Sequence, residues 1–405
     1  MKIAYIVPYV PNLIRTRPYN LILQLISLGH QVDVFTIGSN QQDRADATTL
    51  QNKGAAVHYY VQPIWRSLLN SAWAIPTDRP LQSVYSWHTG MAQEIADQVS
   101  RKAYDVVHVE HLRGSRYGLF LKAKFPSQTV IWDSVDCISH LFEQASSQSS
   151  SLFGKFVTRF ELPRTKKAEG NLIGDFDHAL VTSSTDKNAL LELANDEKPL
   201  SPLSVLPNGV DLDYFCPNPA AQRKPETIVF SGKMSYHANI SMVKYLVAEI
   251  MPRVWKIRPG ARLIIVGKDP STEIKELGRN PLITVTGTVD DIRPFLWQAT
   301  VSVVPLLYGA GIQNKILEAM ATATPVITTL RTLSALEARP GLDIVAADTA
   351  ENFAQEIVRL MSNLEHRDTL GSSGLAYVQK NHNWKNIAGS LVDVYQQSLP
   401  HNGSG

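Results

Sequence analysis

Short apolar runs alternate with amphipathic segments along this 405-residue chain, and that alternation limits its fold more than any other feature. Residues 3–7 and 31–36 are typical of buried strands, and residues 18–28 between them place leucines on one face of a helix. A strand, a crossover helix and a second strand predict a parallel sheet. The first loop, residues 8–18, is rich in proline and arginine. It is not a GxGxxG loop, so it carries no dinucleotide-binding fingerprint.

The alternation stops at the turn signal Pro207-Asn208-Gly209 and then restarts. We expect further strands before the turn at residues 57–61, 105–109, 129–132 and 179–182, and after it at 227–231, 262–266, 283–286 and 301–305. Two successive doubly wound units predict an α/β protein of two Rossmann-like domains facing a cleft. The chain is long enough to give each domain a substantial core.

Composition disfavours several kinds of partner. Basic and acidic residues number 39 and 37, so no global charge favours nucleic acid. The two cysteines provide neither a disulfide framework nor a metal cluster, which fits a reducing compartment such as the cytoplasm. We find no apolar stretch of the roughly 18 residues that a membrane span needs.

The stretch of residues 305–328 carries the strongest sign of a ligand site. A strand end, a loop with Gly309 and Gly311, and a helix N-terminus present free N–H groups to an anion. On that helix Lys315 adds a cation, and the carboxylate of Glu318 suits a vicinal diol such as a ribose. Together these groups indicate a nucleotide diphosphate. The alternative is an ordinary strand, loop and helix with a solvated Glu318.

Several motifs resemble those of one known family. The run VLPNGVDLDYF from Val205 resembles the interdomain signature of the large retaining nucleotide-sugar glycosyltransferase family numbered four. The runs IVFSGKM, LIIVGK, VTGTVDDIRPFL and KILEAMATATPVI follow in that family's order, and several motifs in order are more specific than any one of them. The earlier runs DVVHVEH and WDSVDCIS resemble a subgroup associated with bacterial exopolysaccharide clusters.

This resemblance implies the GT-B fold, with a nucleotide diphosphate sugar as donor in the second domain and the acceptor in the first. The run HNWKNIAGSLVDVY is similar to the family's terminal helix, which returns to the first domain. We therefore expect an acceptor domain at residues 1–206 with the helix 384–400, and a donor domain at 207–383. The family needs no metal and no cofactor. The Asp-x-Asp pattern at Asp211 and Asp213 belongs to the interdomain signature, which argues against a metal site there.

The resemblance also assigns donor-binding residues by position. Glu318 matches the glutamate that binds the ribose hydroxyls, and Lys233 matches a basic residue at the diphosphate. Gly311 matches a glycine that faces phosphate or sugar, and Val289 stands where a backbone group meets the base. The expected donor-binding set is Gly232, Lys233, Gly267, Val289, Gly311, Ile312, Gln313, Asn314, Lys315 and Glu318.

The chain departs from the family pattern at three places. Ala310 replaces a glutamate that usually contacts the transferred sugar. Ala238 and Asn239 occupy the region where the family has a second lysine, and we expect Lys315 to supply the missing cation. Asp133 is nearest the position of a histidine. It could bind a sugar hydroxyl or accept its proton, but a helix cap or a buried structural acid is an equal alternative.

These assignments give two further expected sets. The catalytic set is Asp133, Lys233, Lys315 and Glu318. The acceptor side contains His111, Asp133 and Asp136, because polar residues past the carboxyl ends of parallel strands lie where α/β sheets bind ligands. For His111 the alternative is a packed histidine at the end of a strand.

Two segments of the first domain allow two interpretations each. Residues 67–87 contain Trp73 and Trp87, and we expect them to form a packed lid, with an aromatic acceptor platform as the alternative. Residues 153–167 place apolar side chains at helical spacing beside basic ones. This pattern is typical of a core-facing stripe, and a membrane-surface helix is the alternative.

The sequence thus predicts a retaining, metal-independent glycosyltransferase. It would move a sugar to a hydroxyl of a carbohydrate, lipid-linked or small-molecule acceptor, in polysaccharide, glycolipid or glycoconjugate synthesis. Ala310 keeps open a nucleotide-sugar-binding protein with weakened catalysis. A nucleotide-sugar epimerase on the same scaffold is a third interpretation, which the interdomain signature disfavours. We expect a cytoplasmic protein, free or at the inner face of the membrane.

Overall fold

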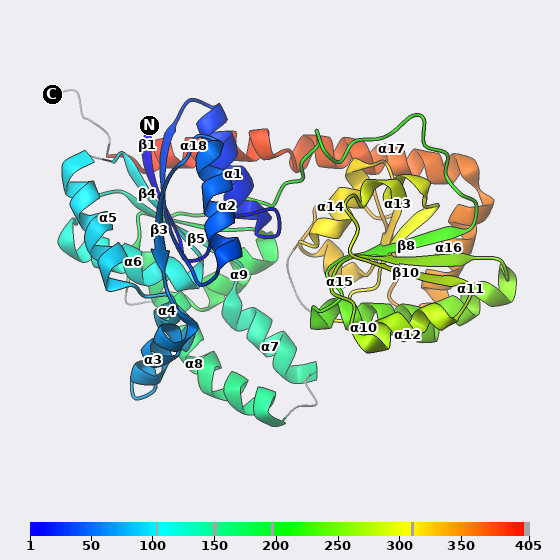
Figure 1. The fold of residues 1–405 in the computed structure, drawn as a ribbon, viewed down its shortest axis with the longest axis horizontal. Coiled ribbons are helices and arrows are strands. Elements are labelled where there is room, and N and C mark those ends of the chain that lie inside the picture. Colours follow the sequence, from blue (N-terminus) through cyan, green and yellow to red (C-terminus); the bar gives the residue numbers. More distant parts are fainter. Residues whose placement is uncertain (103, 149–151, 196–197, 309–311, 401–405) are drawn as a thin grey trace. The chain divides into compact units, whose positions relative to one another are not determined.

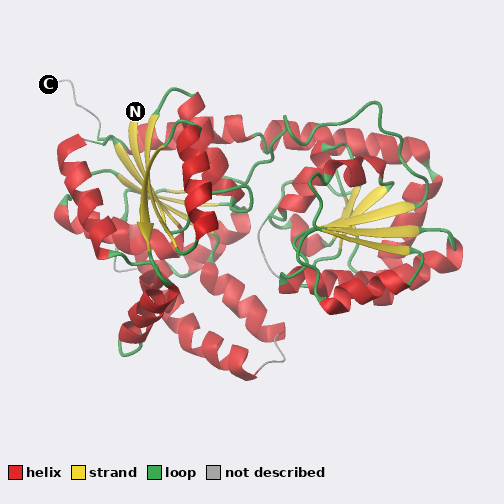
Figure 2. Cartoon of the chain, viewed as in Figure 1, coloured by secondary structure: helices red, strands yellow, loops and turns green. Residues whose placement is uncertain are grey.

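The computed structural model describes residues 1–102, 104–148, 152–195, 198–308 and 312–400. The chain divides into two compact units, Met1–Pro207 with Trp384–Gly405, and Asn208–Asn383. The junction after residue 207 lies one residue from the expected domain boundary. Each unit is a sheet with helices packed on both of its faces (Figures 1 and 2).

The first unit is built on a seven-stranded sheet of order β3-β2-β1-β4-β5-β6-β7. All of these strand pairs are parallel. The strands are β1 Lys2–Val7, β2 Gln31–Gly38, β3 Ala56–Val61, β4 Val106–Glu110, β5 Val130–Val135, β6 His178–Val181 and β7 Leu203–Val205. The inner strands are valine- and isoleucine-rich because helices cover both of their faces.

The helices of the first unit include the last helix of the chain. They are α1 Thr16–Ser27, α2 Gln41–Asn52, α3 Ile64–Ala74, α4 Leu81–Tyr85, α5 Thr89–Lys102, α6 His111–Lys124, α7 Ile138–Gln148, α8 Leu152–Asp175, α9 Ser184–Glu192 and α18 Trp384–Ser398. On α18, Ile387, Leu391 and Tyr395 share a buried core with Leu21 and Leu25 of α1. The terminal helix therefore belongs to the first unit.

The second unit is built on a six-stranded parallel sheet of order β10-β9-β8-β11-β12-β13. Its strands are β8 Thr227–Ser231, β9 Arg262–Val266, β10 Ile283–Gly287, β11 Val301–Val304, β12 Val326–Thr328 and β13 Val345–Ala346. Its helices are α10 His237–Tyr245, α11 Met251–Ile257, α12 Thr272–Glu276, α13 Arg293–Gln298, α14 Asn314–Ala321, α15 Leu330–Leu333, α16 Ala350–Ser362 and α17 Leu364–Asn381. A π-helical turn, Leu246–Ile250, separates α10 from α11, and a 3-10 turn, Leu277–Arg279, follows α12.

In both sheets the order of strand addition reverses once, between β1 and β4 in the first unit and between β8 and β11 in the second. Open α/β sheets bind ligands outside the carboxyl ends of the strands at such a switch point. Gly232 directly follows β8, and Glu110 is the last residue of β4. These two strand ends locate the candidate sites. The prediction of two doubly wound α/β units is confirmed.

The segment after β3 differs from the packed lid that the sequence predicts. Trp65 and Trp73 on α3 are 63% and 81% exposed, whereas Trp87 is half-buried beside Tyr117. The lid prediction is wrong for α3, because its large apolar residues lie on the side that faces solvent, whereas the buried residues of this helix are Ser67 and Ala74.

The stripe at residues 153–167 lies on α8, and the side chains of residues 153–158 fall outside the described part of the chain. Among the described residues, no helix combines the length and the apolar content that crossing a bilayer requires.

Candidate functional site

Two glycines bring the ends of β8 and β9 together in the second unit. Gly232 and Gly267 follow these strands with φ angles of 150° and 149°. A Cβ on Gly267 would lie 1.8 Å from the carbonyl oxygen of Gly232, so only glycine fits there. The N–H of Gly232 donates to the carbonyl oxygen of Val266 at 3.0 Å. The two expected donor-binding glycines thus form one backbone surface at the switch point.

Lys315 reaches the same surface from α14. Its Nζ donates to the side-chain oxygen of Asn239 on α10 and lies 4.7 Å from the ring centre of Phe230. A Cβ added to Gly232 would lie 3.2 Å from that Nζ, so the ammonium group sits against the end of β8. Lys315 is only 8% exposed. Burial lowers its pKa to about 7, against the opposing charge of Glu318.

Glu318 lies one helical turn after Lys315 and is half-buried. Burial raises its pKa to about 7, and the neighbouring Lys315 opposes that rise. Among the described residues, its carboxylate has no hydrogen-bond or ion-pair partner. A ligand that brings hydroxyls to this carboxylate and negative charge to Lys315 would satisfy both groups.

Lys233 and Val289 lie at more exposed positions of this edge. Lys233 directly follows Gly232, and its Nζ is 3.8 Å from Oδ2 of Asp269, with both side chains about half exposed. Because exposed ion pairs are weak, Lys233 can turn toward another anion at little cost. Val289 follows β10 and packs, half-buried, against the core of the unit.

The N-terminus of α14 completes this group of expected residues. The helix begins at Asn314, and its N-cap residue Gln313 makes no side-chain capping bond. Ile312 before it is buried. The positive end of the helix dipole is thus available to an anion. Gly311 and Ala310 lie outside the described residues.

Sequence reasoning missed a polar cluster at the start of α10. The rings of His237 and Tyr308 are stacked with their centres 5.6 Å apart, and His237 Nδ1 is 2.9 Å from the Tyr308 hydroxyl. Ser241 Oγ is 3.0 Å from the same hydroxyl. Asn239, considered only as the place of a missing lysine, holds Lys315. The useful signal was position, since His237, Asn239 and Ser241 open α10, the first helix after β8.

In the first unit, Asp133 on β5 is an enclosed partner of Arg17. Its side chain is fully buried, and Arg17 Nε and Nη2 lie 2.9 and 2.8 Å from its Oδ2. The N–H of Val135 donates to Oδ1 at 3.1 Å. An acceptor hydroxyl cannot reach a carboxylate enclosed in this way. We therefore correct the catalytic and acceptor-side assignment of Asp133 in favour of its alternative, a buried structural acid.

Glu110 lies opposite Asp133 on the neighbouring strand β4. It accepts hydrogen bonds from the hydroxyls of Tyr5 at 2.9 Å and Tyr9 at 2.6 Å. Burial raises the pKa of Glu110 to about 7, and the charge of Asp133 adds to the rise. The sequence analysis placed its neighbours His111 and Asp133 on the acceptor side but did not include Glu110.

Two residues at the ends of β4 and β5 have left-handed backbone, namely His111 directly after β4 and Val135 as the last residue of β5. His111 has φ of 64° and Val135 has φ of 69°, which is rare for a β-branched residue. His111 is half-buried, and its Nδ1 accepts from the N–H of Arg113 at 3.3 Å. Burial lowers the pKa of His111 to about 3, so the ring is neutral at pH 7. Asp136 is half-buried, and burial raises its pKa to about 7.

A cavity of about 190 Å³ opens where β1 and β2 end. Tyr9, Arg15, Tyr85 and Arg113 are among the residues that line it. The guanidinium of Arg15 lies 4.9 Å from the ring centre of Tyr9, and that of Arg113 lies 5.8 Å from the ring centre of Tyr85. Aromatic faces, hydroxyls and cations in one cavity suit a hydroxyl-rich ligand.

The Asp-x-Asp pattern closes a turn. Asp211 Oδ1 accepts backbone N–H groups of Asp213 and Tyr214 at 3.1 and 3.0 Å. Among the described residues, no group of three histidine, cysteine, aspartate or glutamate side chains is arranged to hold a metal ion.

Two family models match the chain along most of its length. The model described as Glycosyltransferase Family 4 matches residues 15–214, and that described as Glycosyl transferases group 1 matches residues 225–363. The chain belongs to this glycosyltransferase family. The family predicted from the ordered motifs is therefore confirmed, and the protein is an enzyme of the glycosyltransferase class.

Known proteins resemble this glycosyltransferase over at least nine-tenths of its length. An uncharacterized 44.6 kDa protein in the cps region of Klebsiella pneumoniae is 22% identical over 380 residues, covering 91% of this chain and 92% of that protein. Sucrose-phosphate synthase from Thermosynechococcus elongatus has a TM-score of 0.70 at 18% identity, covering 98% of both chains. Anabaena HepE in complex with UDP and glucose has a TM-score of 0.68 at 13% identity, covering 98% of this chain and 100% of that one. These structural likenesses show the fold, and the predicted GT-B class is confirmed.

Proposed function

We propose that the enzyme moves a sugar from a nucleotide diphosphate sugar, held by its second unit, to a hydroxyl of an acceptor held by its first. The observation that carries this proposal is the pair formed by Lys315 and Glu318. A buried lysine lies against the end of β8, and a half-buried carboxylate without a described partner lies one turn further along the same helix. A diphosphate and a ribose together would satisfy both.

In this proposal, Lys315, Lys233 and the N-terminus of α14 stabilise the negative charge that develops on the leaving diphosphate. Glu318 accepts hydrogen bonds from the ribose hydroxyls and fixes the nucleotide. The acceptor hydroxyl attacks the anomeric carbon from the face that the diphosphate leaves, and a phosphate oxygen takes the hydroxyl proton. The new bond therefore keeps the anomeric configuration, and no metal is required. Gly232 and Gly267 offer backbone contacts to the donor, and in this proposal Val289 lies beside the base.

A uridine diphosphate sugar is the first donor to test, since the Anabaena protein HepE was solved with UDP and glucose. The cps-region relative supports a place in bacterial polysaccharide, glycolipid or glycoconjugate synthesis. The two cysteines give no disulfide framework, in keeping with cytoplasmic work. Contact of residues 153–167 with the inner face of a membrane stays part of this proposal.

The acceptor site that we propose is the 190 Å³ cavity of the first unit, with His111 and Asp136 on the same carboxyl edge of the sheet. Tyr9 and Tyr85 offer aromatic faces for a sugar ring, and the Tyr85 hydroxyl and the nearby arginines offer polar contacts. The acceptor class that fits is a carbohydrate or a carbohydrate headgroup, free or linked to a lipid.

Incubation with a panel of nucleotide sugars tests the proposal. We expect release of one nucleotide that depends on donor and accelerates with an acceptor, and a product whose anomeric configuration by NMR equals that of the donor. Binding without turnover would favour the catalytically weakened binding protein that Ala310 suggests. Interconversion of the donor's sugar without transfer would favour the epimerase. An inverted product would reject retention and keep the transfer.

A further inference from the structure

The helix α3 presents an apolar face to solvent. Ile64, Trp65, Leu68, Leu69 and Trp73 are between 50% and 81% exposed, and Trp73 is the most exposed of them. Scattered surface leucines are ordinary, but five large apolar side chains on one eleven-residue helix form a contiguous surface that normally has a partner.

The charges on and beside α3 indicate what that partner is. The helix contains one charged residue, Arg66, and no carboxylate. At its end, Arg164 of α8 donates from Nη2 to the carbonyl oxygen of Ile75 at 2.7 Å. The next carboxylate along the chain, Asp78, is paired with Lys167. The border of the apolar face is therefore positively charged.

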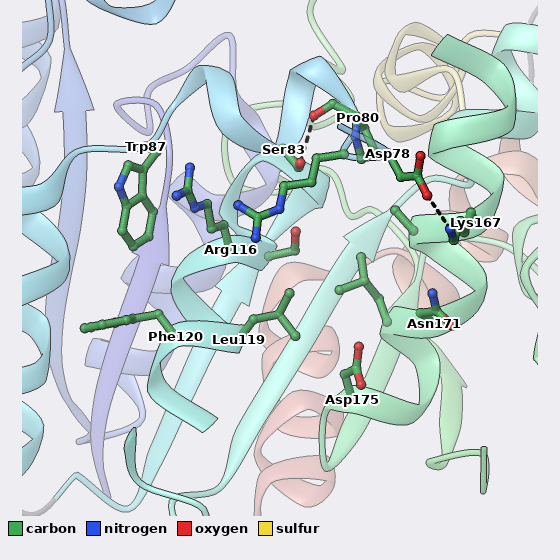
Figure 3. A pocket seen from close by; sticks show the side chains of 14 residues that line it. Asp78, Pro80, Ser83, Trp87, Arg116, Leu119, Phe120, Lys167, Asn171 and Asp175 are labelled. Carbon is green, nitrogen blue, oxygen red and sulfur yellow. Dashed lines mark hydrogen bonds and ion pairs between the residues drawn. The ribbon is translucent and has the colours of Figure 1, made fainter. Parts of the chain in front are cut away.

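Two further arginines lie in a cavity of about 500 Å³ beside this segment (Figure 3). Arg79 follows Ile75 by four residues, so their Cα atoms are at most about 14 Å apart. Arg116 of α6 lies across the same cavity, with its guanidinium 4.2 Å from the ring centre of Trp87. Among the described residues, no carboxylate forms an ion pair with Arg79 or Arg116. The two carboxylates that also line the cavity, Asp78 and Asp175, are paired with Lys167 and Lys198. The two arginines are thus left to pair with a phosphate group on an apolar body.

We propose that α3 lies in the surface of an anionic lipid bilayer, with Trp65 and Trp73 at the level of the headgroups and Arg79 and Arg116 paired with lipid phosphates. Tryptophan suits the interface because its ring is apolar and its N–H is polar. An amphipathic helix bordered by cations binds anionic lipid through buried apolar area and charge together. A second copy of this face is a poorer partner, since it would bring like charges together.

This surface also bears on the acceptor. Ile64 and Ser67 of α3 line the 190 Å³ cavity as well, so a bilayer-bound α3 brings that cavity to the lipid surface. This consequence depends on the proposed function, whereas lipid binding itself does not.

Sedimentation with lipid vesicles tests the proposal. We expect the full chain to bind vesicles of mixed phosphatidylcholine and phosphatidylglycerol at least tenfold more tightly than vesicles of pure phosphatidylcholine. Binding to the mixed vesicles should weaken in high salt. The double change Trp65→Ser and Trp73→Ser should lower the affinity for both vesicle types at least tenfold. Changing Arg79→Gln and Arg116→Gln should remove most of the preference for anionic vesicles.

Matched controls use exposed residues of the second unit. Leu364→Ser, at a side chain 59% exposed, and Arg331→Gln should leave vesicle binding unchanged. Thermal melts establish that each variant is folded. Failure of the wild-type chain to sediment, equal binding to both vesicle types, or equal loss in the controls would overturn the proposal. Vesicle binding needs no sugar donor, so such a failure leaves the proposed transfer standing.

Quenching by brominated lipid gives a second measurement that does not rely on loss of binding. We expect quenching of tryptophan fluorescence when the wild-type chain binds brominated anionic vesicles. Trp65→Phe with Trp73→Phe keeps the face apolar, so this variant should still sediment but lose most of the quenching. Quenching that persists in a bound double variant would overturn the placement of α3.

Discussion

Replacing Lys315 by methionine separates the function of this lysine from its effect on stability. Methionine keeps an unbranched side chain near Phe230 and removes the charge beside Gly232. A hydrogen bond to a charged group contributes about 1.5–3 kcal/mol, and each 1.4 kcal/mol is a factor of ten in affinity. Calorimetry should therefore find that the variant binds UDP, or whichever nucleotide the panel identifies, roughly ten- to hundredfold more weakly.

Stability should change in the opposite direction. The lowered pKa of Lys315 shows that burying its ammonium group costs free energy in the folded chain, and methionine removes that cost. Loss of the hydrogen bond to Asn239 and of the positive charge beside Glu318 offsets part of this gain. We therefore expect the free energy of unfolding of the variant to exceed that of the wild type by about 1 kcal/mol. Urea unfolding at pH 6–7 without nucleotide measures it.

The sign of the pH dependence follows from the pKa of Lys315. Burial lowers this pKa from 10.5 to about 7, so between pH 7 and 10.5 the unfolded chain binds more protons than the folded one. This group therefore makes wild-type stability rise with pH in that window, and the methionine variant lacks that contribution. Nucleotide affinity should fall above pH 7, where Lys315 loses its proton, and should depend less on pH in the variant.

Lys244→Met is the matched control, since Lys244 is an exposed lysine of α10 paired with Glu273. It should change neither affinity nor stability by more than about 0.5 kcal/mol. Unchanged nucleotide affinity in Lys315→Met would refute the role that we give to this lysine. Weaker affinity together with lower stability would show that Lys315 supports the fold instead of the ligand.

Three other changes test the strand ends and the buried acids. Gly267→Ala should prevent native packing of the second unit, since its Cβ would lie 1.8 Å from a backbone oxygen, whereas Gly389→Ala, in open space on α18, should stabilise by about 0.5–1 kcal/mol in thermal melts. Arg17→Met leaves Asp133 buried without its partner and should cost about 3–5 kcal/mol in urea unfolding; a loss under 1 kcal/mol would contradict that pairing. Burial raises the pKa of Glu110 from 4.5 to about 7, so between these pH values the folded chain binds more protons than the unfolded chain. Glu110 therefore makes the stability of the wild type decrease as the pH rises across this range. Glu110→Gln should remove that decrease in thermal melts at pH 4.5–7.5.

Much of the fold could be predicted because parallel strands covered on both faces are continuous apolar runs. The strand runs before and after Pro207 are of this kind, and helices that bury one face show a clear period. The sequence of residues 240–256 predicts one continuous helix, but a π-helical turn, Leu246–Ile250, interrupts it. Pro252 near the start of α11 lacks an N–H group to donate into the preceding turn. The exposed face of α3 could not be predicted, since an apolar helix pattern does not tell which side meets protein.

The candidate site was predictable where one short segment carries it. Lys315 and Glu318 lie three residues apart on α14, so local reasoning brings them together. Asn239 joins Lys315 from 76 positions away, a pairing that no local pattern contains. The assignment of Asp133 failed because its partner is also distant in sequence. Arg17 lies 116 positions away, and local sequence could not show that it encloses the Asp133 carboxylate.

The contrast between Asp133 and Lys315 gives a physical criterion for telling a structural charge from a ligand-binding one. Asp133 has its compensating charge within 3 Å, so it gains nothing from an anion or a hydroxyl. Lys315 has a neutral amide and an aromatic face beside it, and its neighbouring carboxylate has no described partner, so burial raises the free energy of both charges. A buried charge without a compensating partner raises the free energy of the folded chain. A ligand of opposite charge lowers that free energy when it binds, and its affinity is higher for this reason. The same reasoning implies that saturating nucleotide should stabilise the wild-type chain more than Lys315→Met, and equal stabilisation of the two by nucleotide would show that the diphosphate is compensated elsewhere.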